Sequence, residues 1–287
     1  MMRVWKLIVD YGRMIKFSHT IFALPFALTS FVVSGREFPL TLSKFFWIVI
    51  AMAGARSAAM GFNRIVDARY DAKNPRTVNR EIPRGVITQK QAWIFVVIAS
   101  TALVLASYFL NPLCFILSPV ALFFVLFYSL TKRFTATAHI FLGIALGIAP
   151  LGAWIAMSGQ WDWTAFMLGC AVLTWVSGFD IIYACQDYEF DRSEGLFSIP
   201  GKFGIANALW ISRFLHATAI FFLTYVGSHW ELGWIYFAGV CIIATLLIYE
   251  QSLVHAHDLS KVNIAFMNMN GIISITYFVF TVLDIYL

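Results

Sequence analysis

Apolar segments of about 20 residues, the length that a transmembrane α-helix requires, follow one another along almost the whole chain. Short polar connections separate them, and Asn111-Pro112 breaks the third segment from the fourth. We therefore expect an all-α, polytopic membrane protein with nine transmembrane helices bundled together. The expected ranges are 17–35, 43–63, 91–110, 112–131, 137–157, 162–186, 206–228, 231–250 and 264–285.

The composition makes the lipid bilayer the first expected partner. Hydrophobic residues are 60% of the 287 residues and charged residues 12%, against about 45–50% and about 25% in soluble domains. Soluble enzymes and nucleic-acid-binding proteins are therefore excluded. The net charge of +5 indicates no nucleic acid partner, because Lys and Arg in a membrane protein first set its topology. No separate soluble region stands out, so we expect a single transmembrane domain over 1–287.

Basic residues fall almost entirely on one side of the expected spans. Of the 20 Lys and Arg, only Arg36 and Lys44 lie on the opposite side, and Arg56 lies within a span. The positive-inside rule places the basic side in the cytoplasm. We expect an integral protein of the cell (inner) membrane, with its N-terminus in the cytoplasm and its C-terminus outside.

A first polar motif lies at the cytoplasmic end of the second span. Asn63, Asp67 and Asp71 are spaced four residues apart, so they share one helix face if the span continues through them. Arg56 lies on the same face and deeper in the membrane. An arginine at that depth needs a partner, and both a structural ion pair and a bound anion stay open.

A second acidic motif ends the sixth span. Asp187 and Asp191 are four residues apart, Asp180 lies two turns before Asp187, and Tyr183 falls between them. Carboxylates at this spacing repel each other, and desolvation at a membrane edge makes the repulsion worse. Solvated loop charges would explain one such motif, but two motifs at span ends favour a bound cation.

Magnesium is the cation that these residue types favour. Oxygen ligands without nearby His or Cys suit Mg²⁺, which usually shares its coordination shell with phosphate oxygens. Two sites would clamp one diphosphate, with the ligands Asn63, Asp67, Asp71, Asp187 and Asp191. Nearby basic residues would neutralise the diphosphate and the departing pyrophosphate, or serve topology alone. These residues are Arg76, Arg80, Lys132 and Arg133.

The two motifs together are similar to those of the UbiA superfamily of intramembrane aromatic prenyltransferases. That family has Asn-Asp-x-x-Asp-x-x-x-Asp after its second helix and Asp-x-x-x-Asp after its sixth, where this chain has NRIVDARYD and DYEFD. The segments RSAAMGFNR, NPRTVNREIPRG, YSLTKR and AFMNMN also resemble family segments and follow in the same order. The likeness runs from about Arg13 to Asn270. Arg64 departs from the pattern, where Asp often follows the first Asn, and so does Phe197, where relatives often have Lys or His.

The resemblance implies a fold and an activity. The fold would be nine helices around a central cavity, with polyprenyl diphosphate and Mg²⁺ at its cytoplasmic rim and a lateral opening for the lipid tail. The activity would be transfer of the polyprenyl group to a ring carbon of an aromatic acid in ubiquinone or menaquinone biosynthesis. The segments HTIFALPFAL, RSAAMGFNR and GLFSIP resemble most the quinone-biosynthesis branch, which includes 4-hydroxybenzoate polyprenyltransferase-like enzymes. The acceptor would be 4-hydroxybenzoate or a hydroxynaphthoate.

The expected mechanism gives each candidate residue a role. Ionisation of the diphosphate leaves an allylic cation, which aromatic faces such as Tyr128 and Tyr183 can shelter, in a cavity that excludes water. Arg56 would bind the acceptor's carboxylate, or orient Asp180 and Asn63. Asp180 would orient Arg56 or accept the ring proton. The catalytic carboxylates would be Asp67, Asp71, Asp180, Asp187 and Asp191.

Other functions remain open at this point. A polytopic transporter could use intramembrane acids along its path, although the acids here cluster at one face and no inverted repeat is evident. A prenyltransferase of the same family could instead use haem, a glycerol phosphate lipid or a chlorophyll precursor as its acceptor. Prenyl chain length and oligomeric state are left open by the sequence.

Two smaller expectations concern the fifth span. His139 is a lone histidine, which is more often a packing or interfacial residue than a functional one. Gly143 and Gly147 form a Gly-x-x-x-Gly pattern, which lets two helix backbones approach closely.

Overall fold

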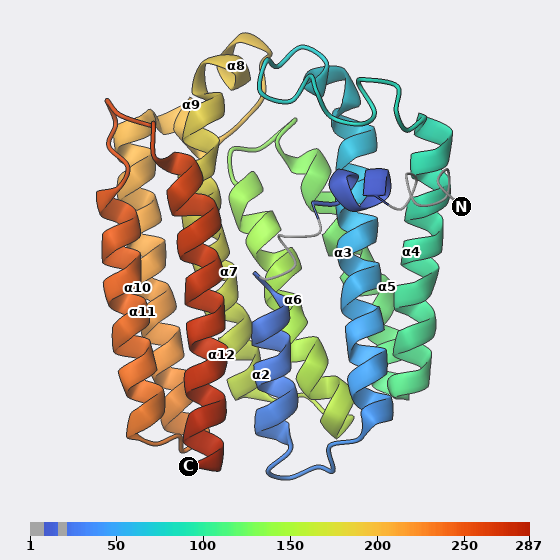
Figure 1. The fold of residues 1–287 in the computed structure, drawn as a ribbon, viewed down its shortest axis with the longest axis vertical. Helices are drawn as coiled ribbons and strands as arrows, with labels where there is room; N and C mark the ends of the chain where they lie inside the picture. The colour runs from blue at the N-terminus through green and yellow to red at the C-terminus, as the bar shows by residue number, and fades with distance from the viewer. Residues whose placement is uncertain (1–8, 17–21) are drawn as a thin grey trace.

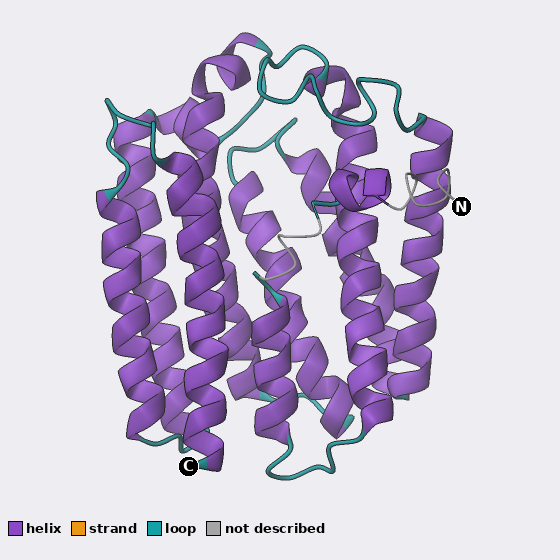
Figure 2. Ribbon diagram, in the orientation of Figure 1, coloured by secondary structure: helices purple, strands orange, loops and turns teal. Residues whose placement is uncertain are grey.

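The regular structure of this chain is helical (Figures 1 and 2). The computed structural model describes residues 9–16 and 22–287, and one isolated bridge, between His255 and Asp258, is the exception to helix within them. Eight helices of the described part are long and apolar enough to cross a membrane. This finding confirms the all-α, polytopic membrane fold.

The helices follow the expected ranges closely, with one exception at the first span. The long helices are α3 (Leu42–Asp71), α4 (Gln89–Leu110), α5 (Pro112–Thr131), α6 (Ala138–Ser158), α7 (Trp163–Ala184), α10 (Ile205–His229), α11 (Trp234–Ser252) and α12 (Asn270–Tyr286). The first expected span, 17–35, contains α2 (Leu24–Ser34), which has 11 residues. Positions 17–21 lie outside the described residues. The described part thus holds eight full-length spans and one shorter apolar helix, where nine full spans were expected.

Local sequence signals explain several helix ends. Asn111 accepts a hydrogen bond from the backbone N–H of Cys114 at 2.9 Å, and Pro112 occupies the first position of α5. Both features favour a helix start. Thr88 and Gln91 form a capping box at the start of α4. These caps place the connections between spans where the sequence predicted them.

The two motif-bearing helices end differently. α3 is a single helix of 30 residues that continues past the expected end at 63 to Asp71, so its motif does share one helix face. α7 ends at Ala184, and a 3₁₀ turn, η2 (Cys185–Asp187), leads into the short helix α8 (Tyr188–Ser193). The second motif therefore lies across a change of helix type, which the spacing of four residues did not predict.

α6 and α7 pack backbone against backbone. A Cβ on Gly143 would lie 2.4 Å from the carbonyl oxygen of Leu173, and one on Gly147 would lie 2.5 Å from that of Gly169. Only glycine allows this approach, which confirms the expectation from the Gly-x-x-x-Gly pattern. The close contact lets polar side chains near the ends of α6 and α7 reach each other.

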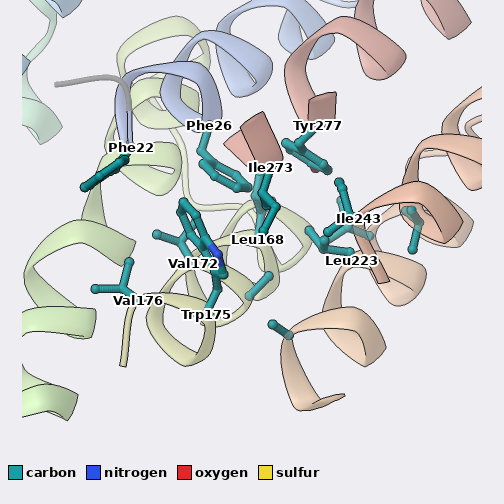
Figure 3. Packing of buried hydrophobic residues seen from close by; sticks show 14 of the residues in the cluster. Phe22, Phe26, Leu168, Val172, Trp175, Val176, Leu223, Ile243, Ile273 and Tyr277 are labelled. Carbon is teal, nitrogen blue, oxygen red and sulfur yellow. The ribbon is translucent and has the colours of Figure 1, made fainter. Parts of the chain in front are cut away.

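A cluster of aromatic and aliphatic side chains joins α2, α7 and α12 (Figure 3). The ring of Phe26 stacks on that of Tyr277 at 4.8 Å between centroids and lies 5.1 Å from that of Trp175. Aromatic pairs at this separation contribute beyond their buried area. The cluster also contains Trp154 of α6, so it holds α2 and α12 against the α6–α7 pair.

The connections that carry the motifs gather at one end of the bundle (Figure 1). The loop after α3, the short helices α8 and α9 (Ile199–Phe203), and the loop after α5 all lie there. The C-terminus lies at the opposite end. The fold therefore brings together polar segments that are more than a hundred residues apart in the sequence.

Candidate active site

A cavity of about 620 Å³ lies among α3, α4, α5, α6 and α7. Its walls are mainly apolar, and residues such as Leu110, Cys114 and Trp161 line it far from the motifs. Its polar end, defined by Asn63, Asp67, Asp71, Asp187 and Asp191, contains every metal ligand that the sequence predicted. A cavity that is polar at one end and apolar along its length suits an amphiphile with a charged head and a hydrocarbon tail.

In the first motif, each carboxylate is buried and already paired with a cation. Asp67 is 2% exposed; its Oδ2 accepts a hydrogen bond from Asn63 Nδ2 at 3.0 Å and lies 2.8 Å from Lys132 Nζ. Asp71 is 5% exposed, and Arg80 donates to both of its oxygens at 2.7 and 2.8 Å. Arg133 lies 3.8 Å from Asp67. The sequence-predicted basic residues thus contact the predicted ligands directly.

In the second motif, Asp187 is held by the loop that follows α3. Arg76 forms a two-point ion pair with it, in which Nε lies 3.0 Å from Oδ1, and Asn74 Nδ2 donates to the same oxygen at 3.0 Å. Burial by itself would lower the pKa of Arg76, but the hydrogen bonds and charge of Asp187 raise it above its usual value. Lys73 and Glu194, 2.6 Å apart, join the same two segments. One loop therefore connects both acidic motifs.

The donor set fits a hard divalent cation. All five expected ligands offer oxygen, as Mg²⁺ prefers. Oδ1 of Asp67 is buried and accepts no hydrogen bond from the described residues, which leaves an oxygen available for a ligand. Within the described residues, no three His, Cys, Asp or Glu side chains stand together in a metal-binding group. Three of the four motif carboxylates, Asp67, Asp71 and Asp187, are instead paired with Lys132, Arg80 and Arg76, respectively.

Deeper in the cavity, a second set of cations has no carboxylate partner among the described residues. Arg56 Nη2 donates to the backbone carbonyl of Lys16 at 3.1 Å, and its buried Nε has no hydrogen-bond partner in the described part of the chain. Arg64 donates to the Met14 carbonyl at 3.2 Å and to Oδ1 of Asn63 at 3.2 Å. Burial and, next, the charge of Arg64 lower the pKa of Lys16 to about 8. The hydrogen bond of Arg56 goes to the Lys16 carbonyl, and Arg56 makes none with Asp180 or Asn63.

Asp180 is paired with His139. His139 Nδ1 lies 2.7 Å from Asp180 Oδ2, and both residues line the cavity. The sequence-based expectation that His139 is a packing residue is therefore incomplete, because it contacts one of the expected catalytic carboxylates. Its partner is on a different helix, so spacing along one helix could not reveal the pair.

Tyr183 lies between a cation and an aromatic ring. Arg76 Nη1 donates to its hydroxyl at 2.7 Å, and the ring of Phe266 stacks on its ring at 4.2 Å between centroids. Phe266 belongs to a π-helix, η3 (Ile264–Met269). Tyr128 and Phe266 also line the cavity. The aromatic faces that the sequence predicted are therefore present beside the polar end.

Asn270, the second Asn of the AFMNMN segment, stabilises the π-helix. Asn270 Nδ2 donates to the carbonyl oxygens of Ala265 and Phe266 at 3.2 and 3.1 Å, and to Glu250 of α11 at 3.3 Å. These bonds satisfy carbonyls at the irregular start of the last span. The sequence analysis singled out the AFMNMN segment that contains this Asn, but the π-helix itself was not predicted. Asn74 was also missed, although it lies in the NPRTVNREIPRG segment.

Comparisons with known proteins agree with this geometry. The model of the UbiA prenyltransferase family matches residues 23–272. The chain is 32% identical over 218 residues to a 4-hydroxybenzoate octaprenyltransferase of Vibrio campbellii, covering 75% of each chain. It is 29% identical over 238 residues to one of Methylobacillus flagellatus, covering 80% of each.

Solved structures show the same fold. A UbiA homologue from Aeropyrum pernix K1 superposes with a TM-score of 0.84 at 33% identity, over 93% of this chain and 98% of that one. A UbiA homologue from Archaeoglobus fulgidus bound to GPP and Mg²⁺ has a TM-score of 0.74 at 19% identity, over 97% and 100%. At that level of identity the second likeness concerns the fold.

Proposed function

Because this chain belongs to the UbiA prenyltransferase family, we propose that it transfers a polyprenyl group from a polyprenyl diphosphate to a ring carbon of an aromatic acid. The acceptor we propose is 4-hydroxybenzoate or a hydroxynaphthoate, which would place the enzyme in ubiquinone or menaquinone biosynthesis. The relatives named as 4-hydroxybenzoate octaprenyltransferases support the first of these acceptors. A prenyltransferase family favours an enzyme over a transporter.

The observation that carries the proposal is the polar end of the cavity. Four carboxylates and at least three basic side chains lie together where a long apolar cavity ends. The basic residues can release the carboxylates and bind phosphate oxygens, because Arg and Lys hydrogen-bond both anions well. Asn63, Asp67, Asp71, Asp187 and Asp191 would hold Mg²⁺, which would stabilise the negative charge of the leaving diphosphate.

The chain's own residues perform the other parts of ionisation. Arg76, Arg80 and Lys132 would bind the diphosphate and stabilise the charge that develops on it. The faces of Tyr183 and Tyr128 would shelter the allylic cation. The apolar wall would exclude the water that otherwise captures the cation.

The deeper cations suit the acceptor. Arg56, Arg64 and Lys16 line the cavity, and none of them forms an ion pair with a carboxylate of the described residues. A buried arginine needs an anionic or hydrogen-bonding partner. We infer that Arg56 and Lys16 bind the acceptor's carboxylate, so that the ring lies between them and the polar end. An acceptor without an anionic group would leave this charge unbalanced.

The membrane orientation follows from the basic residues around the polar end. The connections after α3, α5 and α7 lie at this end (Figure 1) and carry eight of the 20 Lys and Arg, whereas the connection between α2 and α3 at the other end carries only Arg36 before Lys44 in α3. The positive-inside rule supports a cytoplasmic location for it. Substrate would then enter from the cytoplasmic face of the cell (inner) membrane.

The test is an assay of detergent-purified protein with Mg²⁺, geranyl diphosphate or longer homologues, and a panel of aromatic acids, read by mass spectrometry. We expect a prenylated acid that disappears with EDTA and in Asp67→Asn and Asp187→Asn. Glu37→Gln is the matched control, because Glu37 is exposed at the other end of the bundle. If no acid is prenylated and geranyl diphosphate is neither bound nor cleaved, the proposal is wrong.

A further inference from the structure

Asp180 differs in its partner from the three ion-paired carboxylates of the cavity, and Asp191, which also lines the cavity, forms no ion pair within the described residues. Asp67, Asp71 and Asp187 each pair with a Lys or Arg side chain, whereas Asp180 pairs with His139. A fixed cation stabilises the ionised carboxylate and makes it a weak base. We propose that His139 is a positioning residue, which holds Asp180 so that Asp180 accepts the proton lost from the acceptor ring. This inference rests on the proposed function.

The packing of α6 on α7 makes the pair possible. Gly143 and Gly147 bring the two backbones together, since any Cβ there would overlap carbonyl oxygens of α7. One turn before Gly143, His139 thereby reaches Asp180, with 2.7 Å between Nδ1 and Oδ2. Ser177 donates from its hydroxyl to the His139 carbonyl at 3.1 Å and fixes the helices at the same level. The pair is built into the scaffold and does not depend on a loop.

The other ring nitrogen of His139 determines which nitrogen carries the proton. The backbone N–H of Ile199 points to Nε2 at 3.4 Å, and an N–H can only donate, so Nε2 accepts. In a neutral imidazole the proton is then on Nδ1, which donates to Asp180. His139 is 4% exposed, so its ring cannot turn without losing both bonds. Ile199 begins α9, which lies at the same end of the bundle as the acidic motifs (Figure 1).

This arrangement leaves one oxygen of Asp180 available. Oδ2 accepts from His139, while Oδ1 accepts no hydrogen bond from the described residues, and the residue lines the cavity. An N–H donor of a neutral ring stabilises a carboxylate less than a cation does. Asp180 lies seven residues before Asp187, which is roughly 10 Å deeper at 1.5 Å per residue. A ring that attacks the first carbon of the prenyl group would lie at that depth, below the diphosphate.

The proposed step is balanced as follows. The ring carbon forms a bond to the allylic carbon with a pair of ring electrons, and this carbon then carries both hydrogen and the prenyl group. Oδ1 of Asp180 takes the hydrogen as a proton, and the C–H electron pair returns to the ring and restores its aromaticity. Asp180 becomes a neutral carboxylic acid, His139 keeps its proton on Nδ1, and the proton passes to water after the product leaves.

The test uses geranyl diphosphate, Mg²⁺ and 4-hydroxybenzoate that is deuterated at the ring carbons beside the hydroxyl. In the unmodified enzyme, proton loss follows bond formation rapidly, so we expect equal rates with the deuterated and ordinary acceptors. His139→Leu keeps a similar volume but removes the donor, and we expect kcat to fall about 10- to 100-fold, as for lost orienting partners elsewhere. We also expect a primary deuterium isotope effect to appear, because proton removal becomes rate-limiting.

Two further variants separate positioning from packing. In His139→Gln the side-chain amide can still donate to Asp180, so we expect most of kcat to return and the isotope effect to disappear. Asp180→Asn loses the base, and we expect a fall of about 100-fold or more with an isotope effect. In every variant, the KM for geranyl diphosphate should stay within about twofold of the unmodified enzyme, because the polar end is unchanged.

The outcomes of these experiments distinguish failure of the His139–Asp180 role from failure of the proposed function. A fall in kcat without an isotope effect in both His139→Leu and Asp180→Asn would overturn the role of the pair, while Mg²⁺-dependent prenylation by the unmodified enzyme would leave the proposed function standing. If the unmodified enzyme neither prenylates 4-hydroxybenzoate nor cleaves geranyl diphosphate, the proposed function fails and the inference fails with it. Unchanged geranyl diphosphate binding by the variants shows that they are folded.

Discussion

Replacing Arg80 with glutamine should weaken the protein without ligands and, at the same time, make it bind Mg²⁺ alone more tightly. Arg80 donates to both oxygens of Asp71, which is 5% exposed, and the arginine side chain is 20% exposed. Removal of one partner from a buried pair costs about 3–5 kcal/mol. Because Arg80 is partly in contact with water, we expect about 2–3 kcal/mol for Arg80→Gln.

The same change frees Asp71 for a metal ion. In the unmodified protein a bound Mg²⁺ must compete with Arg80 for the carboxylate, so Mg²⁺ without a diphosphate should stabilise it only slightly. In Arg80→Gln the ion replaces the lost charge, and the stabilisation follows from the ratio of free Mg²⁺ to its dissociation constant. With Mg²⁺ and geranyl diphosphate together, the unmodified protein should be stabilised more than Arg80→Gln, since Arg80 is then needed to bind the phosphate.

Thermal unfolding in detergent can be measured without ligands, with Mg²⁺ alone, and with Mg²⁺ and geranyl diphosphate together. We expect the midpoint of Arg80→Gln to lie roughly 5–10 °C below that of the unmodified protein without ligands, to recover with Mg²⁺ alone, and to remain lower with both ligands. Arg84→Gln is the matched control, because Arg84 is exposed in the same loop and makes no side-chain hydrogen bond or ion pair within the described residues. If Mg²⁺ alone raises the midpoint of the unmodified protein as much as that of Arg80→Gln, the competition between Arg80 and the metal is refuted.

Three other predictions follow from the geometry. The lowered pKa of Lys16, about 8, means that the residue loses its charge as the pH rises through 8. The KM for 4-hydroxybenzoate should therefore rise between pH 7.5 and 9 (roughly one unit around this pKa). In Lys16→Arg this rise in KM should be absent, since Arg stays charged. A rise that persists in this variant would come from titration of the acceptor and not of residue 16. Gly143→Ala should cost about 1–3 kcal/mol through overpacking. Gly152→Ala on the same helix, with no atom within 4 Å of the added Cβ, should leave the thermal midpoint unchanged. Equal thermal midpoints for the two variants would contradict the close packing. Tyr183→Phe removes the acceptor of an Arg76 hydrogen bond and should raise the KM for geranyl diphosphate severalfold with little change in the EDTA sensitivity, which steady-state kinetics would check.

Sequence reasoning reached furthest where one helix contains the whole pattern. Asn63, Asp67 and Asp71 lie on α3 because no glycine or proline interrupts the helix between them, so the spacing predicts the shared face correctly. The second motif was described less well, since η2, whose last residue is Asp187, interrupts the helix between Asp180 and Asp191. That irregular turn is stabilised by contacts with the distant loop after α3, and such contacts have no period in the sequence.

Pairs between helices were the part that the sequence could not provide. Arg56 was expected to bind the acceptor's carboxylate or to orient Asp180 and Asn63; in the structure it bonds to the backbone of Lys16, and Asp180 bonds to His139. Periodicity identifies which residues share a face of one helix, but the neighbour of that face depends on how the helices assemble. The Gly143 pattern predicted that α6 would approach some helix closely, without naming α7.

The way in which the acids are neutralised changes the physical argument for the metal. From spacing alone, the repulsion between Asp67 and Asp71 required a cation at the membrane edge, and Mg²⁺ was the cation inferred. In the structure Lys132 and Arg80 already supply this charge, so the carboxylates of the first motif are paired without a metal. A diphosphate that enters with its Mg²⁺ brings both an anion for the basic residues and a cation for the carboxylates, and this exchange keeps each buried charge paired throughout. Mg²⁺ or diphosphate alone would leave one set of charges unpaired in a partly desolvated site, which is costly. We therefore expect the two ligands to bind with positive cooperativity, by the same coupling free energy in either order.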